Sequence, residues 1–191
     1  MGTPTGTADP ALAFVDGATG TADPALAFVD GALARIPELV GGVDREAMAL
    51  VLLLHRVTNV VVYDLESTVH RPAGWSWSAF RAVFPLWVGG PLEPSRLAEL
   101  SGMSRQAVSA LAKTLEADGL IARQSVDHDG RSVRFALTPA GERQLEQAFR
   151  AHNDRESQWA ATLSPAERAT LTALLAKLAA ASRQPWVSHR F

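Results

Sequence analysis

The stretch between residues 94 and 120 constrains this chain more than any other, because it carries a fixed spacing of small and apolar residues. Ala98 is followed after three intervening residues by Gly102, and Val108 and Leu111 come after five and then two more. A small Ala lets two helices cross closely, Gly permits a tight turn, and Val with Leu seals the crossing. The spacing predicts a helix-turn-helix, with an ordinary helical hairpin as the alternative.

A β-hairpin is predicted directly after these helices. The segments 120–126 and 132–138 flank the loop DHDGR at 127–131, whose Asp129-Gly130 step is a strong turn signal. A helix-turn-helix followed by a hairpin is a winged helix, which favours DNA binding over the plain helical hairpin. We therefore expect a mainly α fold with a small β-hairpin wing.

Apolar helices are predicted on both sides of this region. Residues 44–68 read as one helix that is apolar nearly all round, so one chain of this length cannot bury it alone. A second helix is expected over 75–88, with an end or kink near Phe84 because Pro85 cannot donate a backbone hydrogen bond.

The C-terminal part is expected to form two more helices. Thr138 and Pro139 begin a helix that runs to about residue 163, and Ser164 with Glu167 forms a capping box that opens the next. The last helix carries a leucine stripe at helical spacing, which predicts a homodimer when combined with the apolar helix at 44–68. The stripe consists of Leu171, Leu174, Leu175 and Leu178.

The N-terminal arm, residues 1–43, contains an exact duplication. Residues 5–18 read TGTADPALAFVDGA, and residues 19–32 repeat the same letters. Each copy is expected to form a short helix, in the second case capped by Asp23 and ended by Gly31. We interpret the identity as a recent duplication and expect the arm to be partly disordered, with its first copy undocked.

Composition excludes several classes of function. The chain has no cysteine, so thiol catalysis, disulfides and cysteine-bound metals are excluded. The five histidines show no closely spaced ligand pair, and the motifs of common enzymes are missing, so we expect no metal, no cofactor and no catalytic activity. The uncharged apolar run 47–54 is shorter than the about 20 residues of a membrane span. We expect no membrane association and a cytoplasmic protein.

The order of these segments resembles the MarR family of bacterial transcriptional regulators. The resemblance covers residues 44–180 and is carried by LAELSGMSRQAVSALAKTLEADGLIAR, the wing DHDGR, LTPAG at 137–141 and LSPAE at 163–167. It implies a homodimer on a pseudo-palindromic operator and, in many members, a small aromatic or phenolic effector that weakens DNA binding. The corresponding domains are 44–70 with 139–183 for dimerisation and 75–138 for the winged helix.

The resemblance also implies which residues bind DNA. The recognition helix presents its polar side to the major groove, and the wing carries the family's Asp-x-Arg pattern, in which Arg enters the minor groove. The residues on these positions are Ser104, Arg105, Gln106, Ser109, Lys113, Asp129 and Arg131. Ala110 and Thr114 stand where relatives often have Arg, which removes phosphate contacts and puts the affinity in doubt.

An effector pocket is expected between the dimer helices and the winged region. Aromatic rings beside a few polar groups suit a planar organic anion, although the same rings on apolar helices also fit an ordinary core. The candidate residues are His55, Trp75, Trp77, Arg81, Trp87 and His152. We expect a sequence-specific repressor; the alternative is an architectural or protein-binding winged-helix protein without an effector response.

Overall fold

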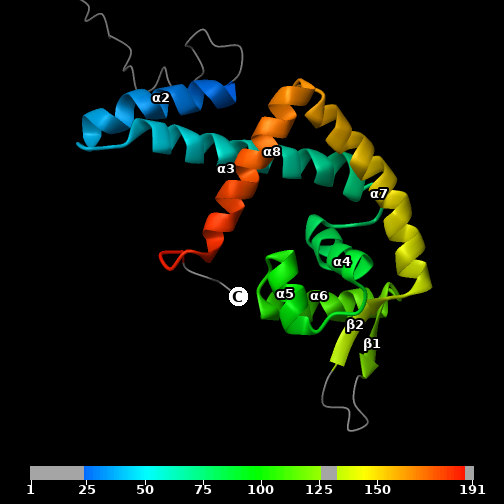
Figure 1. Ribbon diagram of the computed structural model, residues 1–191. Helices are drawn as coiled ribbons and strands as arrows, with labels where there is room; N and C mark the ends of the chain where they lie inside the picture. Colours follow the sequence, from blue (N-terminus) through cyan, green and yellow to red (C-terminus); the bar gives the residue numbers. More distant parts are fainter. Residues whose placement is uncertain (1–23, 126–132, 188–191) are drawn as a thin grey trace, which may run out of the picture. The chain divides into compact units, whose positions relative to one another are not determined.

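The computed structural model describes residues 24–125 and 133–187 (Figure 1). Its residues divide into two compact units, Met1–Val61 and Val62–Phe191. The expected mainly α fold with a small β-hairpin is confirmed: the elements are helical apart from one sheet of two antiparallel strands.

The first unit contains α2 (Pro24–Leu39) and most of α3 (Arg45–Leu65). The expectation that Gly31 ends the helix of the second repeat copy is wrong, because α2 continues through Gly31 and through Pro37. Burial of Ala27 and Val29 on this helix offsets the low helix propensity of one glycine. The first copy lies outside the described residues.

Most of α3 exposes apolar side chains. Its N-terminus is capped as expected, since the backbone N–H of Ala47 donates to Asp44 Oδ1 over 3.0 Å. Val51 is 63 % exposed, and other leucines and valines of the helix are exposed as well. The continuous helix Arg45–His70 is, among the described residues, the one helix long and apolar enough to cross a membrane by length and composition. Length and composition therefore allow either lipid or protein to cover this surface.

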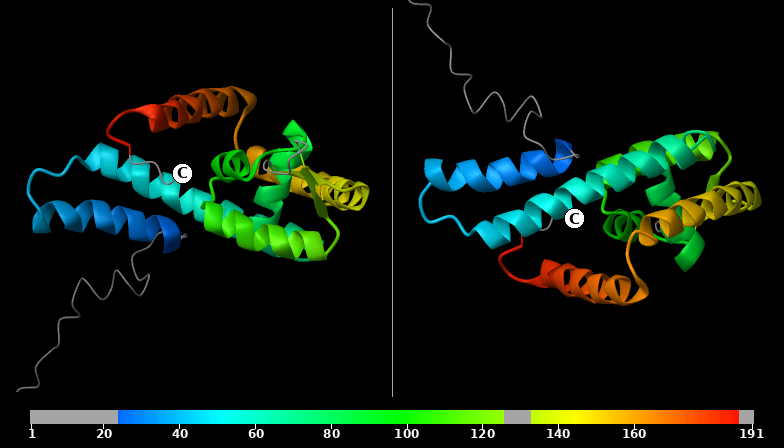
Figure 2. Two further views of the ribbon diagram at one scale, coloured as in Figure 1. Left: turned by 90° about the horizontal axis from the view of Figure 1, so that it is seen from below. Right: turned by 90° about the horizontal axis from the view of Figure 1, so that it is seen from above.

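The second unit holds the winged region and the C-terminal helices (Figure 2). In both views α7 is one long helix that leads away from the strands toward α8. The elements are the π-helical turn η1 (Glu66–His70), α4 (Trp77–Gly89), α5 (Pro94–Ser101), α6 (Arg105–Ala117), β1 (Ile121–Ser125), β2 (Val133–Leu137), α7 (Pro139–Ala160), α8 (Pro165–Ala180) and the 3-10 turn η2 (Ala181–Arg183).

The helix α4 does not end at Pro85. It runs on to Gly89, so of the two expectations, an end or a kink near Phe84, the end is wrong and the kink stays a prediction. Proline removes one backbone hydrogen bond from the helix. Buried side chains on both sides of it, Val83 and Leu86, hold the next turn in place.

The core of the winged region joins α4, α5, α6, the hairpin and α7. Leu97 and Leu145, from α5 and α7, are 1 % and 0 % exposed. The hairpin adds Phe135, whose backbone also pairs with Leu92 ahead of α5, so a third segment closes the base of the wing. The apolar parts of the recognition motif and the wing thus belong to one core.

A compact junction connects the wing to α7. Thr138 Oγ1 accepts from the N–H of Gly141 over 3.0 Å and donates to the carbonyl of Gly119 over 2.6 Å. A Cβ on Gly141 would lie 2.1 Å from the carbonyl oxygen of Leu120, so only glycine fits there. The predicted start of this helix is confirmed.

The helix α8 begins as predicted and leaves its leucines open. Ser164 and Glu167 form the expected capping box, which holds the pKa of Glu167 below its usual value through hydrogen bonds from Ser164. No residue of α8 is buried. The exposed fractions of Leu171, Leu174, Leu175 and Leu178 are 44 %, 55 %, 40 % and 43 %.

Candidate nucleic-acid interface

The helix-turn-helix predicted from the spacing is formed by α5 and α6. Gly102 ends α5 in the left-handed region, with φ +64°, and its N–H donates to the carbonyls of Ala98 and Glu99. Ser104 caps α6 by accepting from the N–H of Ala107 over 3.1 Å. Ala98 and Val108 are each 1 % exposed, as expected where the two helices cross.

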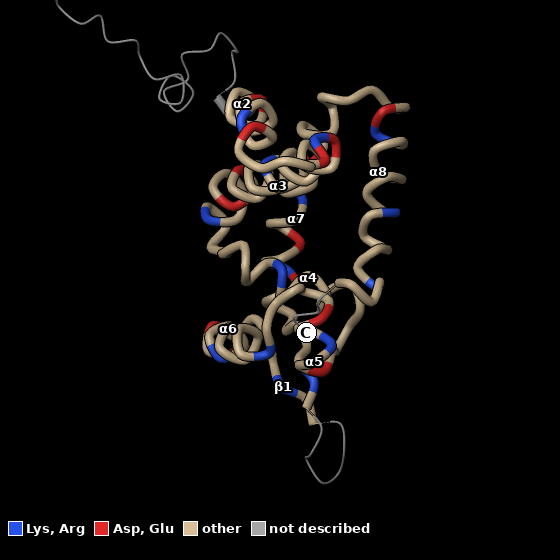
Figure 3. The backbone as a smooth tube through the Cα atoms, turned by 90° about the vertical axis from the view of Figure 1, so that its left-hand side faces the viewer, with Lys and Arg blue, Asp and Glu red and all other residues tan. Residues whose placement is uncertain are grey.

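The outer side of α6 carries the residues expected to contact bases. Arg105, Gln106, Ser109 and Lys113 are all exposed, and their spacing places them on adjoining turns of one side. Ser104 uses its oxygen as the cap and keeps a hydroxyl hydrogen to donate. Figure 3 shows Lys and Arg on α5, α6 and β1, with acidic residues between them.

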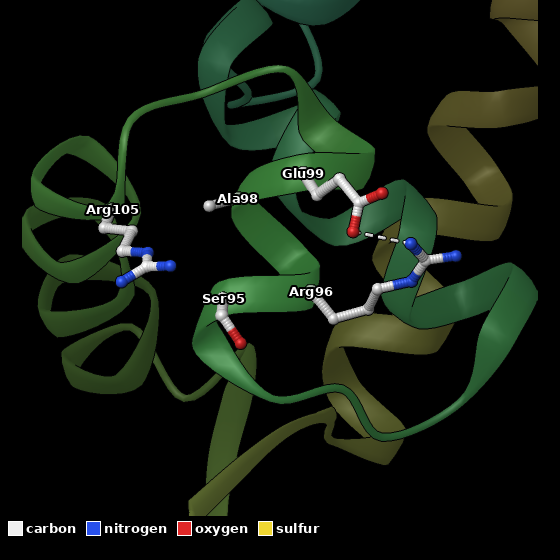
Figure 4. A pocket seen from close by; sticks show the side chains of 5 residues that line it. All are labelled: Ser95, Arg96, Ala98, Glu99 and Arg105. Atoms are coloured by element: carbon white, nitrogen blue, oxygen red, sulfur yellow. Dashed lines mark hydrogen bonds and ion pairs between the residues drawn. The ribbon is translucent and has the colours of Figure 1, made fainter. Parts of the chain in front are cut away.

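A small hollow separates the beginnings of α5 and α6. Its volume is about 250 Å³, and its lining comes from Ser95, Arg96, Ala98, Glu99 and Arg105 (Figure 4). Arg105 reaches from α6 toward α5, whereas Arg96 turns to Glu99 and pairs with it over 2.6 Å. Arg105 has no ion pair within the described residues. The hollow therefore combines a free guanidinium with the hydroxyl of Ser95.

Ser95 and Arg96 line this hollow and were not among the residues predicted from the sequence to bind DNA. They occupy the first turn of α5, directly after Pro94. The first helix of this motif crosses the DNA backbone, so a serine and an arginine at its start were a usable signal.

The base of the wing is fixed to α6. Arg123 of β1 donates from Nε to Glu116, with distances of 2.9 and 3.0 Å to the two carboxylate oxygens, and its guanidinium carbon lies 5.3 Å from the centre of the Phe135 ring.

Two of the residues expected to bind DNA, Asp129 and Arg131 of the wing, lie outside the described residues, and their role stays a prediction.

The residues expected to bind an effector are distributed over several environments. Trp77 packs against Phe80 and His152, with ring centres 5.9 and 6.4 Å apart. Trp75 is buried, and its indole Nε1 is one of two buried side-chain nitrogens in the described part of the chain that have no hydrogen-bond partner. Trp87 contacts Phe149 edge to face.

The remaining two effector candidates lie in other surroundings. His55 is exposed on α3 in the first unit, where its nearest polar partner is Asn59. Arg81 donates from Nη2 to the carbonyls of Ser101 and Gly102, at the turn of the helix-turn-helix.

A buried histidine pair lies beside Trp77. His70 Nε2 is 3.1 Å from His152 Nδ1, and His152 Nε2 is 3.0 Å from Glu156 Oε1. An ionised carboxylate only accepts, so His152 donates to Glu156 and accepts from His70. His70 Nδ1 is then left without a hydrogen and, within the described residues, without a partner.

The pKa of His70 is lowered to about 4. Burial is the largest cause and the nearby His152 acts in the same direction, whereas Glu66 acts in the opposite direction. His70 was absent from the sequence prediction because its partner is 82 residues away.

A second hollow, of about 490 Å³, lies between η1 and α7. It contains neutral polar groups and apolar walls, and its lining includes none of the predicted effector residues. The lining residues are Thr68, Val69, Pro72, Ala73, Gln144, Gln147, Ala148 and Ala151.

The C-terminal end of α7 is held by an ion pair with Asp64, near the end of α3. Asp64 accepts from Arg155 at 2.6 and 2.7 Å and from the indole N–H of Trp159 at 2.7 Å. These three hydrogen bonds hold the pKa of Asp64 below its usual value, with Arg155 as the largest cause.

Comparison with known proteins identifies the family. The sequence profile of the MarR family matches residues 80–132. The HTH-type transcriptional regulator YwaE of Bacillus subtilis (strain 168) is 33 % identical over 141 residues, which are 73 % of this chain and 82 % of YwaE. The chain belongs to the MarR family. It is therefore a MarR-family transcriptional regulator, in a family of regulators and not of enzymes.

Solved structures of this family have the same fold. The MarR-family regulator from Silicibacter pomeroyi is 26 % identical, with a TM-score of 0.60 over 71 % of this chain and 91 % of that one. Bordetella bronchiseptica BpsR, whose DNA binding is regulated by 6-hydroxynicotinic acid, is 23 % identical, with a TM-score of 0.61 over 66 % of this chain and 96 % of that one.

Proposed function

We propose that this MarR-family regulator is a repressor that binds a pseudo-palindromic operator as a homodimer. The observation that carries the proposal is the exposed polar side of α6, with Arg105, Gln106, Ser109 and Lys113, on a helix whose other side is packed in the core. Arg pairs with guanine edges and Gln with adenine edges in the major groove. The wing, through Asp129 and Arg131, reads the adjacent minor groove.

The charge of the DNA-binding region favours sequence-specific binding. Residues 95–150 carry 8 bases and 7 acids, so general attraction to phosphates is weak. Binding then depends on base contacts and on a few well-placed phosphate contacts. The hollow between Ser95 and Arg105 suits one such phosphate, since it offers a hydroxyl and a guanidinium that has no ion pair among the described residues. An architectural factor would need a broad basic surface.

A second copy of the chain is the proposed cover for α3 and α8. The helix α3 exposes leucines and valines and α8 exposes leucines, and apolar surface of this extent is typical of a subunit interface. The leucines of α8 cannot be assigned to a lipid span, because that helix has 16 residues. A second copy of the chain can cover the leucines of α8 and the apolar residues of α3, so we propose a cytoplasmic protein.

A small aromatic molecule is the proposed effector. The cluster of Trp77, Phe80, His70 and His152 offers closely packed rings, some stacked and some tilted, with polar nitrogens. The regulation of BpsR by 6-hydroxynicotinic acid supports a ligand of this size on this fold. A planar phenol or aromatic carboxylate bound there would change the separation of the two recognition helices, which must match one turn of DNA.

Selection from a random DNA library followed by a gel-shift assay tests the proposed DNA binding. The wild type should enrich a pseudo-palindrome. Gln106→Ala should relax preference at one or two positions per half-site, at a cost of about 1 to 3 kcal/mol. Arg131→Ala should instead weaken selected and random DNA alike. Enrichment of no sequence would favour the architectural alternative and contradict the proposal.

Tryptophan fluorescence tests the effector. Salicylate, 4-hydroxyphenylacetate and related phenols are titrated into the protein with and without the selected DNA. A true effector quenches fluorescence and releases DNA, and Trp77→Ala blunts both effects. If no compound changes either signal while DNA binding persists, the aromatic cluster is core.

A further inference from the structure

Arg81 spans two parts of the winged region. Its backbone belongs to α4, between the buried residues Phe80 and Ala82, so the start of the side chain is fixed by the core. Its guanidinium donates from Nη2 to the carbonyl of Ser101 and, over 3.1 Å, to that of Gly102. Nη2 carries two hydrogens, one for each carbonyl.

The two carbonyls lie where the chain leaves α5 for α6. The carbonyls one turn earlier have partners within the motif, since Ser101 Oγ donates to Leu97 over 2.6 Å and the N–H of Met103 donates to Ala98 over 3.0 Å. The last carbonyls of a helix have no partner inside it, and a cation there also offsets the helix dipole. Arg81 supplies both the donors and the charge.

Gly102 is matched to this contact in two ways. Its φ of +64° favours glycine, and a Cβ added to it would lie 2.8 Å from Nη2 of Arg81. Because Gly102 has no side chain, the guanidinium of Arg81 has room to lie against the turn. Two residues further on, Ser104 caps α6 and the residues expected to read bases begin.

We infer that Arg81 is a positioning residue for DNA recognition, which fixes the turn of the helix-turn-helix and thereby the orientation of α6. The inference rests on the proposed DNA binding and assigns Arg81 to the reading of DNA sequence instead of to an effector site. Non-specific binding depends on total charge, whereas base reading depends on the angle of the recognition helix. Loss of Arg81 therefore lowers discrimination between sequences.

The test measures the ratio of affinities for the selected operator and for random DNA at one salt concentration. Arg81→Met should lower this ratio about tenfold, the effect of misaligning one bidentate base contact. Affinity for random DNA should stay within about twofold. Arg81→Lys, which keeps a cationic donor, should be intermediate. The control Arg150→Met removes an exposed arginine that pairs with Glu146 on α7, and it should keep the ratio of the wild type.

A pair of glycine variants tests the same contact from its other side. Gly102→Ala and Gly119→Ala both place alanine at a positive φ, but a Cβ on Gly119 meets nothing within 4 Å. Both should lower the melting temperature, and Gly102→Ala alone should lower the ratio. Amide hydrogen exchange should be faster at Gly102 and Met103 in Arg81→Met, with the amides of α4 unchanged.

The outcomes separate this inference from the proposed function. If the wild type binds no DNA selectively, the proposed function fails. If the wild type discriminates and Arg81→Met discriminates equally well, with or without a lower melting temperature, Arg81 has only a structural role and the inference is overturned. The inference is equally overturned if Arg81→Met changes only the response to an effector.

Discussion

The winged region and the helix α8 use the same apolar residues in opposite ways. In the winged region Leu97 and Leu145 are almost completely buried, whereas Leu174 of α8 is 55 % exposed. A leucine contributes to stability only when water is removed from it. The difference shows that the winged region buries its leucines within its own chain. The leucines of α8 can contribute to stability only when a second surface covers them.

Polar groups follow the same division. Within the winged region, hydrogen bonds that anchor the chain come from residues such as Ser104, Thr138 and Arg81. The two buried side-chain nitrogens without a partner among the described residues, on His70 and Trp75, lie where η1 leads into α4. Of the two side chains only His70 can take up a proton, and its pKa is lowered by burial, so protonation of His70 should destabilise this junction.

The largest expected effect comes from adding charge to the open helix. Leu174→Glu combined with Leu178→Glu should abolish the proposed dimer, because burial of two leucines contributes on the order of 3 to 6 kcal/mol. Analytical ultracentrifugation should detect monomer or unfolded protein. Ala169→Glu with Ala173→Glu adds the same charges at the same spacing on the other side of α8. If both pairs of substitutions behave alike, the leucine stripe is not the interface.

Acidification should destabilise the folded protein through His70, the buried last residue of η1. Its pKa is about 4 in the folded protein, and a histidine in an unfolded chain titrates near 6.5, so the unfolded state binds the proton first. The unfolding free energy should therefore be highest above pH 6.5 and fall as the pH drops to 4, by up to about 3 kcal/mol. Urea denaturation between pH 7 and pH 5 measures the slope.

Two substitutions test whether His70 causes this pH dependence of the unfolding free energy. The charged and titratable groups around His70 are His152, Glu66 and, through His152, Glu156. His70→Gln should flatten the pH dependence, whereas His55→Gln, at an exposed position on α3, should retain it. An unchanged slope in His70→Gln would assign the pH dependence to another group.

A single methyl group should damage the junction between the wing and α7. Gly141→Ala places a Cβ against the backbone carbonyl of Leu120, at a distance that requires the chain to move. We expect a loss of about 2 kcal/mol in unfolding free energy, measured by thermal or urea denaturation. Gly89→Ala is the control, since its nearest contact would be 3.9 Å away, at Leu92. Equal stability of the two variants would mean that the junction is not close-packed.

The smallest effect is expected from the arm. Removal of residues 1–18 should change the unfolding free energy by less than about 0.5 kcal/mol and leave DNA affinity unchanged. Removal through Gly42 should cost more, because it also deletes α2 with the buried Ala27 and Val29. A large loss from the shorter deletion would show that the first copy of the repeat contributes to the dimer or to DNA binding.

The sequence predicts those features whose signals are local. Gly102 and Ser104 mark the turn and the cap of the recognition motif within three positions of each other, and the capping box at Ser164 spans four residues. The helix through Pro85 could not be predicted in the same way. The local penalty of a proline is visible in sequence, but the burial of Val83 and Leu86 that offsets it depends on helices from other parts of the chain.

The candidate site was predictable on α6 and less so elsewhere. Residues of one helix side follow from a spacing of three and four, so Arg105, Gln106 and Ser109 could be grouped in advance. Contacts of long sequence separation leave no such pattern: Arg81 meets the turn 20 residues away, and His70 meets His152 across 82. Arginine and histidine beside aromatic residues suggested a ligand pocket. In the structure Arg81 instead donates hydrogen bonds to the carbonyls of Ser101 and Gly102 at the turn.

The paired strands at the base of the wing affect which changes of wing length the fold can tolerate. The strands are joined from Ile121 opposite Leu137 up to Ser125 opposite Val133, and the Thr138 junction fixes the lower end independently. Insertions or deletions beyond the upper end, between Ser125 and Val133, leave α7 and the recognition helix where they are. We therefore expect wing length to vary by mutation without a loss of folding, so that the proposed minor-groove contacts can change separately from the base contacts proposed for α6.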